Sequence, residues 1–174
     1  MIANDQIRSI LSGGDRRSIG RVADVVVLIE QHPQWISSLA GCLWDEDACV
    51  RMRSADALEK ISRERPLLLK SYKAALLTLL AETTQQEVRW HLALVLPRLL
   101  LTQSECRRVA EVLQAYLEDR SSIVKTFAMQ GLADLTTQCA SLRSPVVEMI
   151  RVHTRSGTPA MRARGRKLLQ TLEQ

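Results

Sequence analysis

The sequence predicts an all-α protein, a right-handed α-solenoid of about five antiparallel helical pairs, on the strength of two observations. An apolar residue followed by a basic one recurs at intervals of 38, 36 and 37 residues, beginning at Val50, Val88, Val124 and Met161. Apolar or small residues follow each of these opening residues after 4, 7, 8 and 11 positions, which places them on one stripe of an α-helix. A repeat of this length indicates one helical unit stacked on copies of itself.

The register of the pattern predicts where each helix lies. We expect the first helices of the pairs over residues 3–11, 34–44, 67–82, 103–118 and 145–155. We expect the second helices over residues 15–31, 48–64, 86–101, 122–138 and 160–173. The repeats then span about 1–31, 32–65, 66–102, 103–139 and 140–174, and their short connections predict a single domain over residues 1–174.

Helix-start signals support these boundaries. Thr102 and Glu105 have the spacing of a capping box, and Pro159 fits a first helical position, where its missing N–H costs nothing. The residue three positions before each opening residue takes the N-cap, where Asp, Ser and Thr are good caps and Gln is a poor one. These residues are Asp47, Gln85, Ser121 and Thr158.

The N-terminal repeat follows the pattern loosely. Extending the register 35 residues toward the N-terminus places the opening residue at Asp15, the basic residue at Arg16 and the N-cap at Ser12. The apolar stripe of this repeat would then consist of Ile19, Val22, Ala23 and Val26.

Composition narrows the class of protein. Hydrophobic residues make up 46% of the chain but aromatic residues only 3%, so the core must be built from Leu, Val, Ile and Ala. No apolar run has the length of a membrane span, and the first residues do not have the pattern of a signal peptide. The four cysteines include no Cys-x-x-Cys pair. We therefore expect free thiols and a cytoplasmic protein.

The positive charge is concentrated in the last repeat. Residues 1–142 carry 17 basic and 17 acidic residues, whereas residues 143–174 carry seven basic and two acidic residues. Such an excess can mark a surface for nucleic acid or an acidic partner, or it can be the polar cap that the end of a solenoid needs for solubility.

The motif Asp45…Val50-Arg51…Ala55…Leu58…Ile61 resembles the HEAT-like repeats of the armadillo/HEAT group, and the resemblance covers almost the whole chain. It implies a scaffold or adaptor, or more rarely an enzyme, whose second helices line a concave surface. It also implies that the basic residue of each repeat pairs with the Asp of an inter-helix turn, such as Asp45 or Asp119. The last repeat departs from the motif, with Ser156 where that Asp would stand.

The basic residues of the pattern admit two interpretations. At matching positions of stacked repeats they would form a stripe that could bind phosphates, or they would pair with the turn Asp residues and tie neighbouring repeats together. These residues are Arg16, Arg51, Arg89, Lys125 and Arg162.

The third repeat carries an unusual outward-facing row. Trp90, Leu94, Pro97 and Leu101 lie opposite the buried stripe of their helix, where the second and fourth repeats have polar residues. An exposed row of this kind is typical of a partner hot spot, unless a neighbouring side chain or the curvature of the repeats covers it. Pro97 should kink the helix or end it early.

These patterns lead to two functional hypotheses. The first is a non-enzymatic scaffold that binds a protein or peptide in its groove, or a second copy of the chain, through Trp90, Leu94, Leu101, Arg53 and Arg98. No catalytic residue, metal or cofactor is expected, since His91 has no ligand or base at a suitable spacing along its helix. The alternative is nucleic-acid binding that is similar to the alkylpurine DNA glycosylase group, through the basic residues of the last repeat. These are Arg162, Arg164, Arg166 and Lys167.

Overall fold

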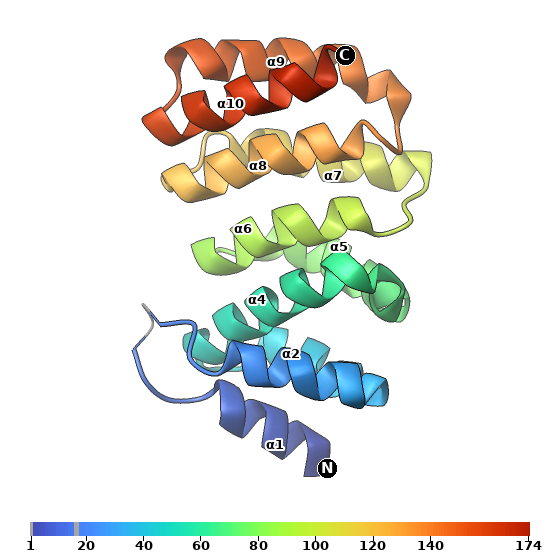
Figure 1. Ribbon diagram of the computed structural model, residues 1–174, viewed down its shortest axis with the longest axis vertical. Helices are drawn as coiled ribbons and strands as arrows, with labels where there is room; N and C mark the ends of the chain where they lie inside the picture. Colours follow the sequence, from blue (N-terminus) through green and yellow to red (C-terminus); the bar gives the residue numbers. More distant parts are fainter. Residues whose placement is uncertain (1, 16–17) are drawn as a thin grey trace. The chain divides into compact units, whose positions relative to one another are not determined.

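A computed structural model describes the backbone of residues 2–15 and 18–174 and the side chains of residues 5–15 and 18–174 (Figure 1). Its α-helices are Ile2–Leu11 (α1), Val22–Gln31 (α2), Ile36–Gly41 (α3), Ala48–Glu64 (α4), Lys73–Glu82 (α5), Gln86–Val95 (α6), Gln103–Tyr116 (α7), Ser122–Leu135 (α8), Arg143–Ser156 (α9) and Pro159–Leu172 (α10). Short 3-10 helices precede or extend them at Pro33–Trp35, Cys42–Trp44, Pro66–Tyr72, Leu96–Arg98 and Ala140–Leu142. The described chain therefore forms five helical pairs, as the repeat predicts.

The caps lie where the sequence places them. Asp47 accepts a hydrogen bond from the backbone N–H of Cys49 at 2.7 Å, and Thr158 accepts one from Met161 at 3.3 Å. Ser121 caps α8, Thr102 and Glu105 form a complete capping box on α7, and Gln85 makes no side-chain cap. Apart from α2, each helix begins within two residues of its predicted start when the 3-10 turns before α3 and α5 are counted.

The prediction for the N-terminal repeat is wrong, because α2 begins at Val22 rather than at Asp15. Gly13, Gly14 and Gly20 have φ values of 74°, 75° and 56°, in the left-handed region that glycine enters easily and that does not continue an α-helix. The buried residues of α2 are Val22, Val25 and Ile29, whereas Ile19 is 59% exposed. Arg16, the expected basic residue of this repeat, lies outside the described residues.

Pro97 ends its helix early, which is one of the two outcomes that its position predicts. The α-helix stops at Val95 and is followed by a 3-10 turn, after which Leu99 is extended. Gln138 stabilises this irregular segment from the end of α8. Its amide nitrogen donates to the carbonyl oxygens of Pro97 at 2.6 Å and Leu99 at 3.0 Å, and its oxygen accepts from the N–H of Leu101 at 3.1 Å.

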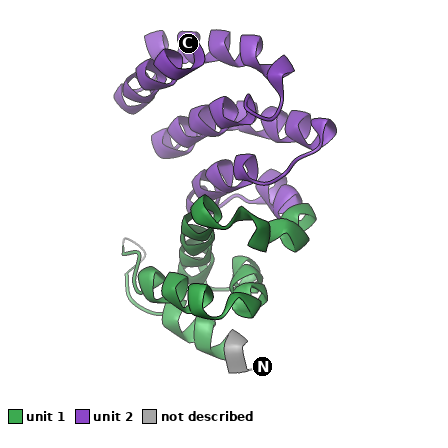
Figure 2. Ribbon diagram, turned by 45° about the vertical axis from the view of Figure 1, so that its right-hand side comes forward, with its two compact units in different colours: residues 1–75 green, residues 76–174 purple. Residues whose placement is uncertain are grey.

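The contacts of the chain divide it into two compact units, residues 1–75 (unit 1) and residues 76–174 (unit 2) (Figure 2). The boundary falls within α5. In unit 1, α1 packs against α2, α3 and α4, and α2 packs against α4. The single domain over residues 1–174, which the short connections indicate, stays a prediction.

In unit 2 the second helices form one layer. α8 packs against both α6 and α10, while α7 packs against α8, and α9 packs against α10 (Figure 1). The space between the helices of unit 2 is filled by aliphatic side chains that are fully buried. Among these are Leu92, Leu96, Val109, Leu113, Val124, Leu132 and Ile150. None of the described helices is long and apolar enough to cross a membrane.

Replacement of Gly131 by Ala should lower the free energy of unfolding by about 1–3 kcal/mol, the usual cost of overpacking. A Cβ atom at this position of α8 would lie 2.3 Å from the carbonyl oxygen of Ala93, a backbone atom of α6. The control is Gly41→Ala in α3, where a Cβ meets nothing within 4 Å. This substitution should raise the free energy of unfolding by up to about 1 kcal/mol, because Ala favours the helix more than Gly does. Urea denaturation measures both variants, and equal stabilities would contradict the close approach of α6 and α8.

Candidate functional site

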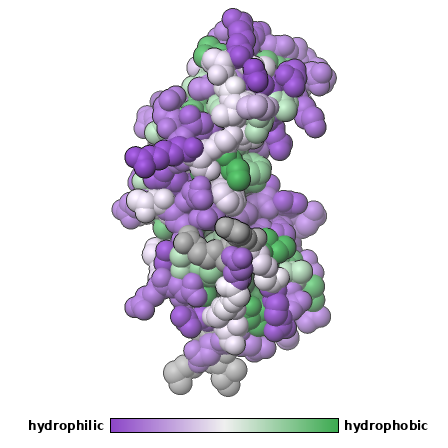
Figure 3. Space-filling model, turned by 90° about the vertical axis from the view of Figure 1, so that its left-hand side faces the viewer, coloured by the Kyte–Doolittle hydropathy of each residue, from purple (hydrophilic) through white to green (hydrophobic). Residues whose placement is uncertain are grey.

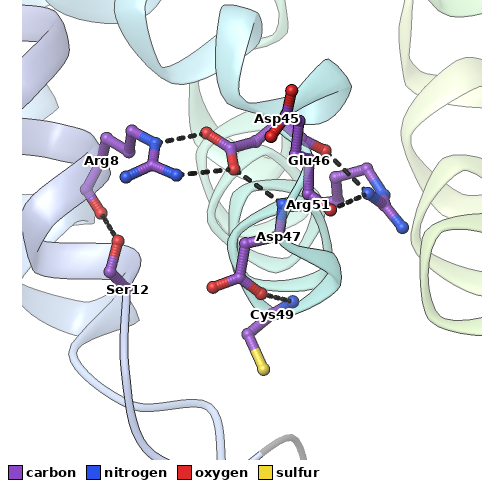
Figure 4. A network of polar contacts seen from close by, with 7 residues as sticks. All are labelled: Arg8, Ser12, Asp45, Glu46, Asp47, Cys49 and Arg51. Carbon is purple, nitrogen blue, oxygen red and sulfur yellow. Dashed lines mark hydrogen bonds and ion pairs between the residues drawn. The ribbon is translucent and has the colours of Figure 1, made fainter.

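The basic residue of the second repeat is engaged in its own inter-helix turn (Figure 4). One guanidinium nitrogen of Arg51 donates to the carbonyl oxygens of Asp45 at 2.7 Å and Glu46 at 2.9 Å. The carboxylate of Asp45 is instead bound by Arg8 of α1, at 2.6 and 3.2 Å. The predicted contact between Arg51 and Asp45 therefore exists, but it runs through the backbone, and Arg8 provides the ion pair.

The basic residue of the third repeat makes the predicted pair directly. Arg89 forms an ion pair with Asp119 at 2.6 Å and donates to the carbonyl oxygen of Thr83 at 2.7 Å. Its guanidinium group also lies 5.2 Å from the centre of the Tyr116 ring. Burial raises the pKa of Tyr116 to about 12, and its hydroxyl donates to the carbonyl oxygen of Leu80. This network links the third and fourth repeats inside unit 2.

Two further residues of the basic row, Lys125 and Arg162, differ from Arg89 in their ion pairing. Among the described residues, no acidic side chain forms an ion pair with Lys125 or Arg162. Arg51 and Arg89 are held by groups of the turns, which favours the structural interpretation for these two residues. The interpretation as a tie between repeats is confirmed for Arg89.

Replacement of Asp45 by Asn should lower stability at neutral pH by an amount that disappears in acid. The hydrogen bond from Arg8 holds the pKa of Asp45 below its usual range. A depressed pKa stabilises the folded state above the unfolded pKa of about 4, and this contribution is lost as the pH falls through the folded value. Urea unfolding from pH 7 to pH 2 measures the gap between wild type and variant.

The matched control for this change is Glu46→Gln, which removes one charge from the same turn at an exposed side chain. This variant should match the wild type at every pH. A gap for Asp45→Asn that stays constant down to pH 2 would contradict the ionic role of the carboxylate.

Arg53, predicted as a charge beside the groove, is a buried structural residue of unit 1. It is 2% exposed. Its guanidinium donates to four carbonyl oxygens of the α1–α2 connection, at 2.5 to 3.2 Å. These belong to Leu11, Gly13, Asp15 and Ser18. Because the group is occupied in holding this connection, we leave Arg53 out of the candidate surface.

Replacement of Arg53 by Met should lower the free energy of unfolding by about 2–4 kcal/mol, because it removes four charge-assisted hydrogen bonds and leaves carbonyl groups without donors. Arg21→Met is the control, since Arg21 forms an exposed ion pair with Asp24 in which its side chain is 67% accessible. That change should cost less than about 1 kcal/mol. Thermal melting compares the two, and a stable Arg53→Met variant would refute the structural role.

The apolar row of the third repeat is mostly covered. Trp90 and Leu101 are half-buried, whereas Leu94 is only 8% exposed and Pro97 is buried. The indole ring of Trp90 lies 5.6 Å from the imidazole of His91. On the face seen in Figure 3, hydrophobic residues form small separate areas among hydrophilic ones. Trp90 and Leu101 are therefore the partly accessible side chains of this row, and Trp90 is the larger of the two.

A cavity of about 370 Å³ that contains charged and polar side chains lies in unit 2, between α8 and α10. It is lined by three basic side chains, Arg143, Arg164 and Lys167, and by Asp134. Gln130, Ala133, Leu168, Leu172 and three threonines complete the lining. Arg143 also donates to the carbonyl oxygen of Leu172, which joins the start of α9 to the end of α10.

Gln130 organises the charges of the cavity. Its amide oxygen accepts from Arg164 at 2.9 Å, and its amide nitrogen donates to Asp134 at 2.8 Å. Burial raises the pKa of Asp134, although the hydrogen bond from Gln130 and the positive charges of Arg98 and Arg164 act in the opposite direction. Arg98, which is half-buried, thus lies close enough to influence this carboxyl group.

The four basic residues predicted to bind nucleic acid do not share one surface. Arg164 and Lys167 line the cavity, whereas Arg162 and Arg166 are exposed and do not line it. Residues two positions apart on an α-helix differ in direction by about 200°, so Arg162 and Arg164 point to opposite flanks of α10.

Sequence reasoning missed Gln130, Asp134 and Arg143. The signal for the first two lies in the repeat register, at 6 and 10 positions after the opening residue of each second helix. At these positions α10 has Lys167 and Thr171, and α6 has Leu94 and Arg98. Gln130 lies in the same outward row as Leu94 of the third repeat, and a polar residue there looks like part of an ordinary solvated flank. Only the apolar residues of the third repeat make this row stand out. Arg143 precedes the predicted start of its helix at residue 145, so it falls outside the helical periodicity that assigns residues to a face.

No protein-family model and no curated protein sequence matches the chain. Solved structures do match it. An engineered protein has a TM-score of 0.67 at 17% identity, covering 98% of this chain and 79% of its own. A second engineered protein has a TM-score of 0.62 at 18% identity, with 98% of this chain and 43% of that chain covered. The designed armadillo repeat protein YIII(Dq)4CqI has a TM-score of 0.62 at 14% identity, and the match covers 95% of this chain and 80% of the designed protein.

Both the helical pairs and these likenesses confirm the predicted fold class. The chain is an all-α solenoid with armadillo/HEAT-like helical repeats.

Proposed function

We propose that the protein is a non-enzymatic scaffold that binds a protein or peptide through the second helices of unit 2. Six residues of α6, the 3-10 turn that follows it, α8 and α10 form what we call the second-helix face. They are Trp90, Arg98, Gln130, Asp134, Arg164 and Lys167. At 100° per residue, their positions in the repeat register lie within about 100° of one another. Equivalent positions of three adjacent repeats thus point in a common direction.

The observation that carries this proposal is the combination, on one layer of helices, of a half-buried Trp with a cavity that contains charged side chains. Interfaces typically combine an aromatic anchor with surrounding polar groups that determine register and orientation. Trp90 supplies the anchor, and the lining of the cavity supplies charged and hydrogen-bonding groups. The four cysteines, all free and buried, suit a reducing compartment, which supports a cytoplasmic location.

Replacement of Trp90 by Ala should weaken peptide binding by about 30-fold or more, the effect of losing an interface hot spot of about 2 kcal/mol. The probe is a set of peptides selected from a random phage-displayed library on the wild-type protein, and calorimetry measures their affinities. The melting temperature should change by only a few degrees.

The matched control is Trp44→Ala, which removes a Trp that is 51% exposed in unit 1 and outside the second-helix face. This variant should bind the selected peptides like the wild type. Equal binding by Trp90→Ala, or a large loss of its stability, would show that Trp90 is a packing residue and would end the proposal for this surface.

A further inference from the structure

The cavity between α8 and α10 carries an excess of positive charge that the protein does not neutralise. Three cations, Arg143, Arg164 and Lys167, face one carboxyl group, that of Asp134. Burial raises the pKa of this carboxyl group, so its negative charge is the costly one to maintain. The cavity is thus suited to an anionic group from outside.

Lys167 is the cation that remains available. Arg164 is held by Gln130 and lies 6.0 Å from the centre of the Phe127 ring, and Arg143 donates to a backbone carbonyl. In the part of the chain that the structure describes, no side chain or carbonyl group binds the ammonium group of Lys167. Its side chain is exposed and lines the cavity, so its ammonium group can contact a ligand that enters from solvent.

The other lining groups are acceptors. Thr136 and Thr137 donate their hydroxyl protons to the carbonyl oxygens of Ala133 and Asp134, each at 2.7 Å, which leaves their oxygen lone pairs free to accept. Asp134 keeps acceptor capacity beyond its bond from Gln130. A ligand that brings N–H donors as well as negative charge therefore matches this lining.

This combination distinguishes between classes of ligand. A polypeptide with acidic side chains offers carboxylates for the cations and backbone N–H groups for the acceptors. A DNA backbone offers acceptors alone, so it would leave the acceptors of the lining without donors. The cavity volume of about 370 Å³ is within the range of sites that take a small group rather than a duplex.

We infer that the cavity between α8 and α10 binds an acidic side chain of a peptide partner, with Lys167 as the ion-pair partner of its carboxylate. The inference rests on the proposed peptide-binding function and specifies the chemistry of the ligand. Arg164 and Arg143 complete the positive field, while Asp134 and Thr137 accept from the peptide backbone.

The test uses fluorescence anisotropy with a labelled twelve-residue peptide of alternating Ser and Glu, at low salt. A peptide with Gln in place of Glu should bind about tenfold more weakly or worse, because it lacks the carboxylates. Replacing Lys167 by Gln should weaken binding of the Glu peptide by about five- to tenfold.

The matched control is Arg166→Gln, which removes the same charge from the neighbouring exposed residue of α10 that does not line the cavity. Its affinity should stay within about twofold of the wild type, since only general charge is lost. Both substitutions are at exposed side chains, so melting temperatures should match the wild type.

Three results would overturn the inference. One is equal weakening by Lys167→Gln and Arg166→Gln, which indicates diffuse attraction. Another is no binding of the Glu peptide at low salt. The third is tighter binding of a twelve-nucleotide single-stranded DNA that is lost in Lys167→Gln, which assigns the cavity to nucleic acid.

These outcomes also separate the inference from the proposed function. If library-selected peptides depend on Trp90 but not on Lys167, the scaffold function stands and the cavity assignment falls. If the Glu peptide depends on Lys167 while no selected peptide depends on Trp90, the cavity assignment stands and the Trp90 surface falls.

Discussion

The close packing of α8 against α6 and α10 is the contact on which the rest of unit 2 depends. No single helical pair can bury its apolar stripe alone, so each second helix must lie against the next. Gly131 permits the approach of α8 to α6, since a Cβ there would lie 2.3 Å from the Ala93 carbonyl oxygen. Gly165 of α10 permits close packing against α9, since a Cβ there would lie 2.0 Å from the Thr154 hydroxyl oxygen. The same short separation brings side chains on the flanks of neighbouring helices, such as Gln130 and Arg164, within hydrogen-bonding distance.

Charged networks at the helix ends complement this packing. In unit 1 the turn residue Asp45 is bound by Arg8, and in unit 2 Asp119 is bound by Arg89. The arginine comes from a first helix in one case and from a second helix in the other, so the turn Asp is the constant partner. An arginine that holds a turn has part of its donor capacity committed to the fold, so it offers less to a ligand. Binding capacity must therefore be sought among the cations outside these networks.

The last repeats supply such cations. Repeat five combines exposed basic residues with one wall of a cavity whose charges are only partly balanced. Arg162 and Arg166 do not line the cavity, whereas Lys167 does. The basic residues of α10 that the composition counts together thus lie on two different surfaces. Arg164 and Lys167 line the cavity, and the other two do not. On the third repeat, burial of Leu94 and Pro97 reduces the predicted apolar row to two half-buried residues, Trp90 and Leu101.

The sequence by itself determined the helical pairs, their register and most of their caps, because a helix that buries one stripe must repeat its apolar residues every three or four positions, and a cap acts within one turn. It also indicated that Pro97 ends or bends its helix. Only the tertiary structure decided that Arg53 is buried on four carbonyl groups, that α2 begins at Val22, and that Asp134 faces Arg164 and Lys167. Those facts depend on the separation of neighbouring helices and on the path of an irregular connection, which periodicity within one helix does not encode.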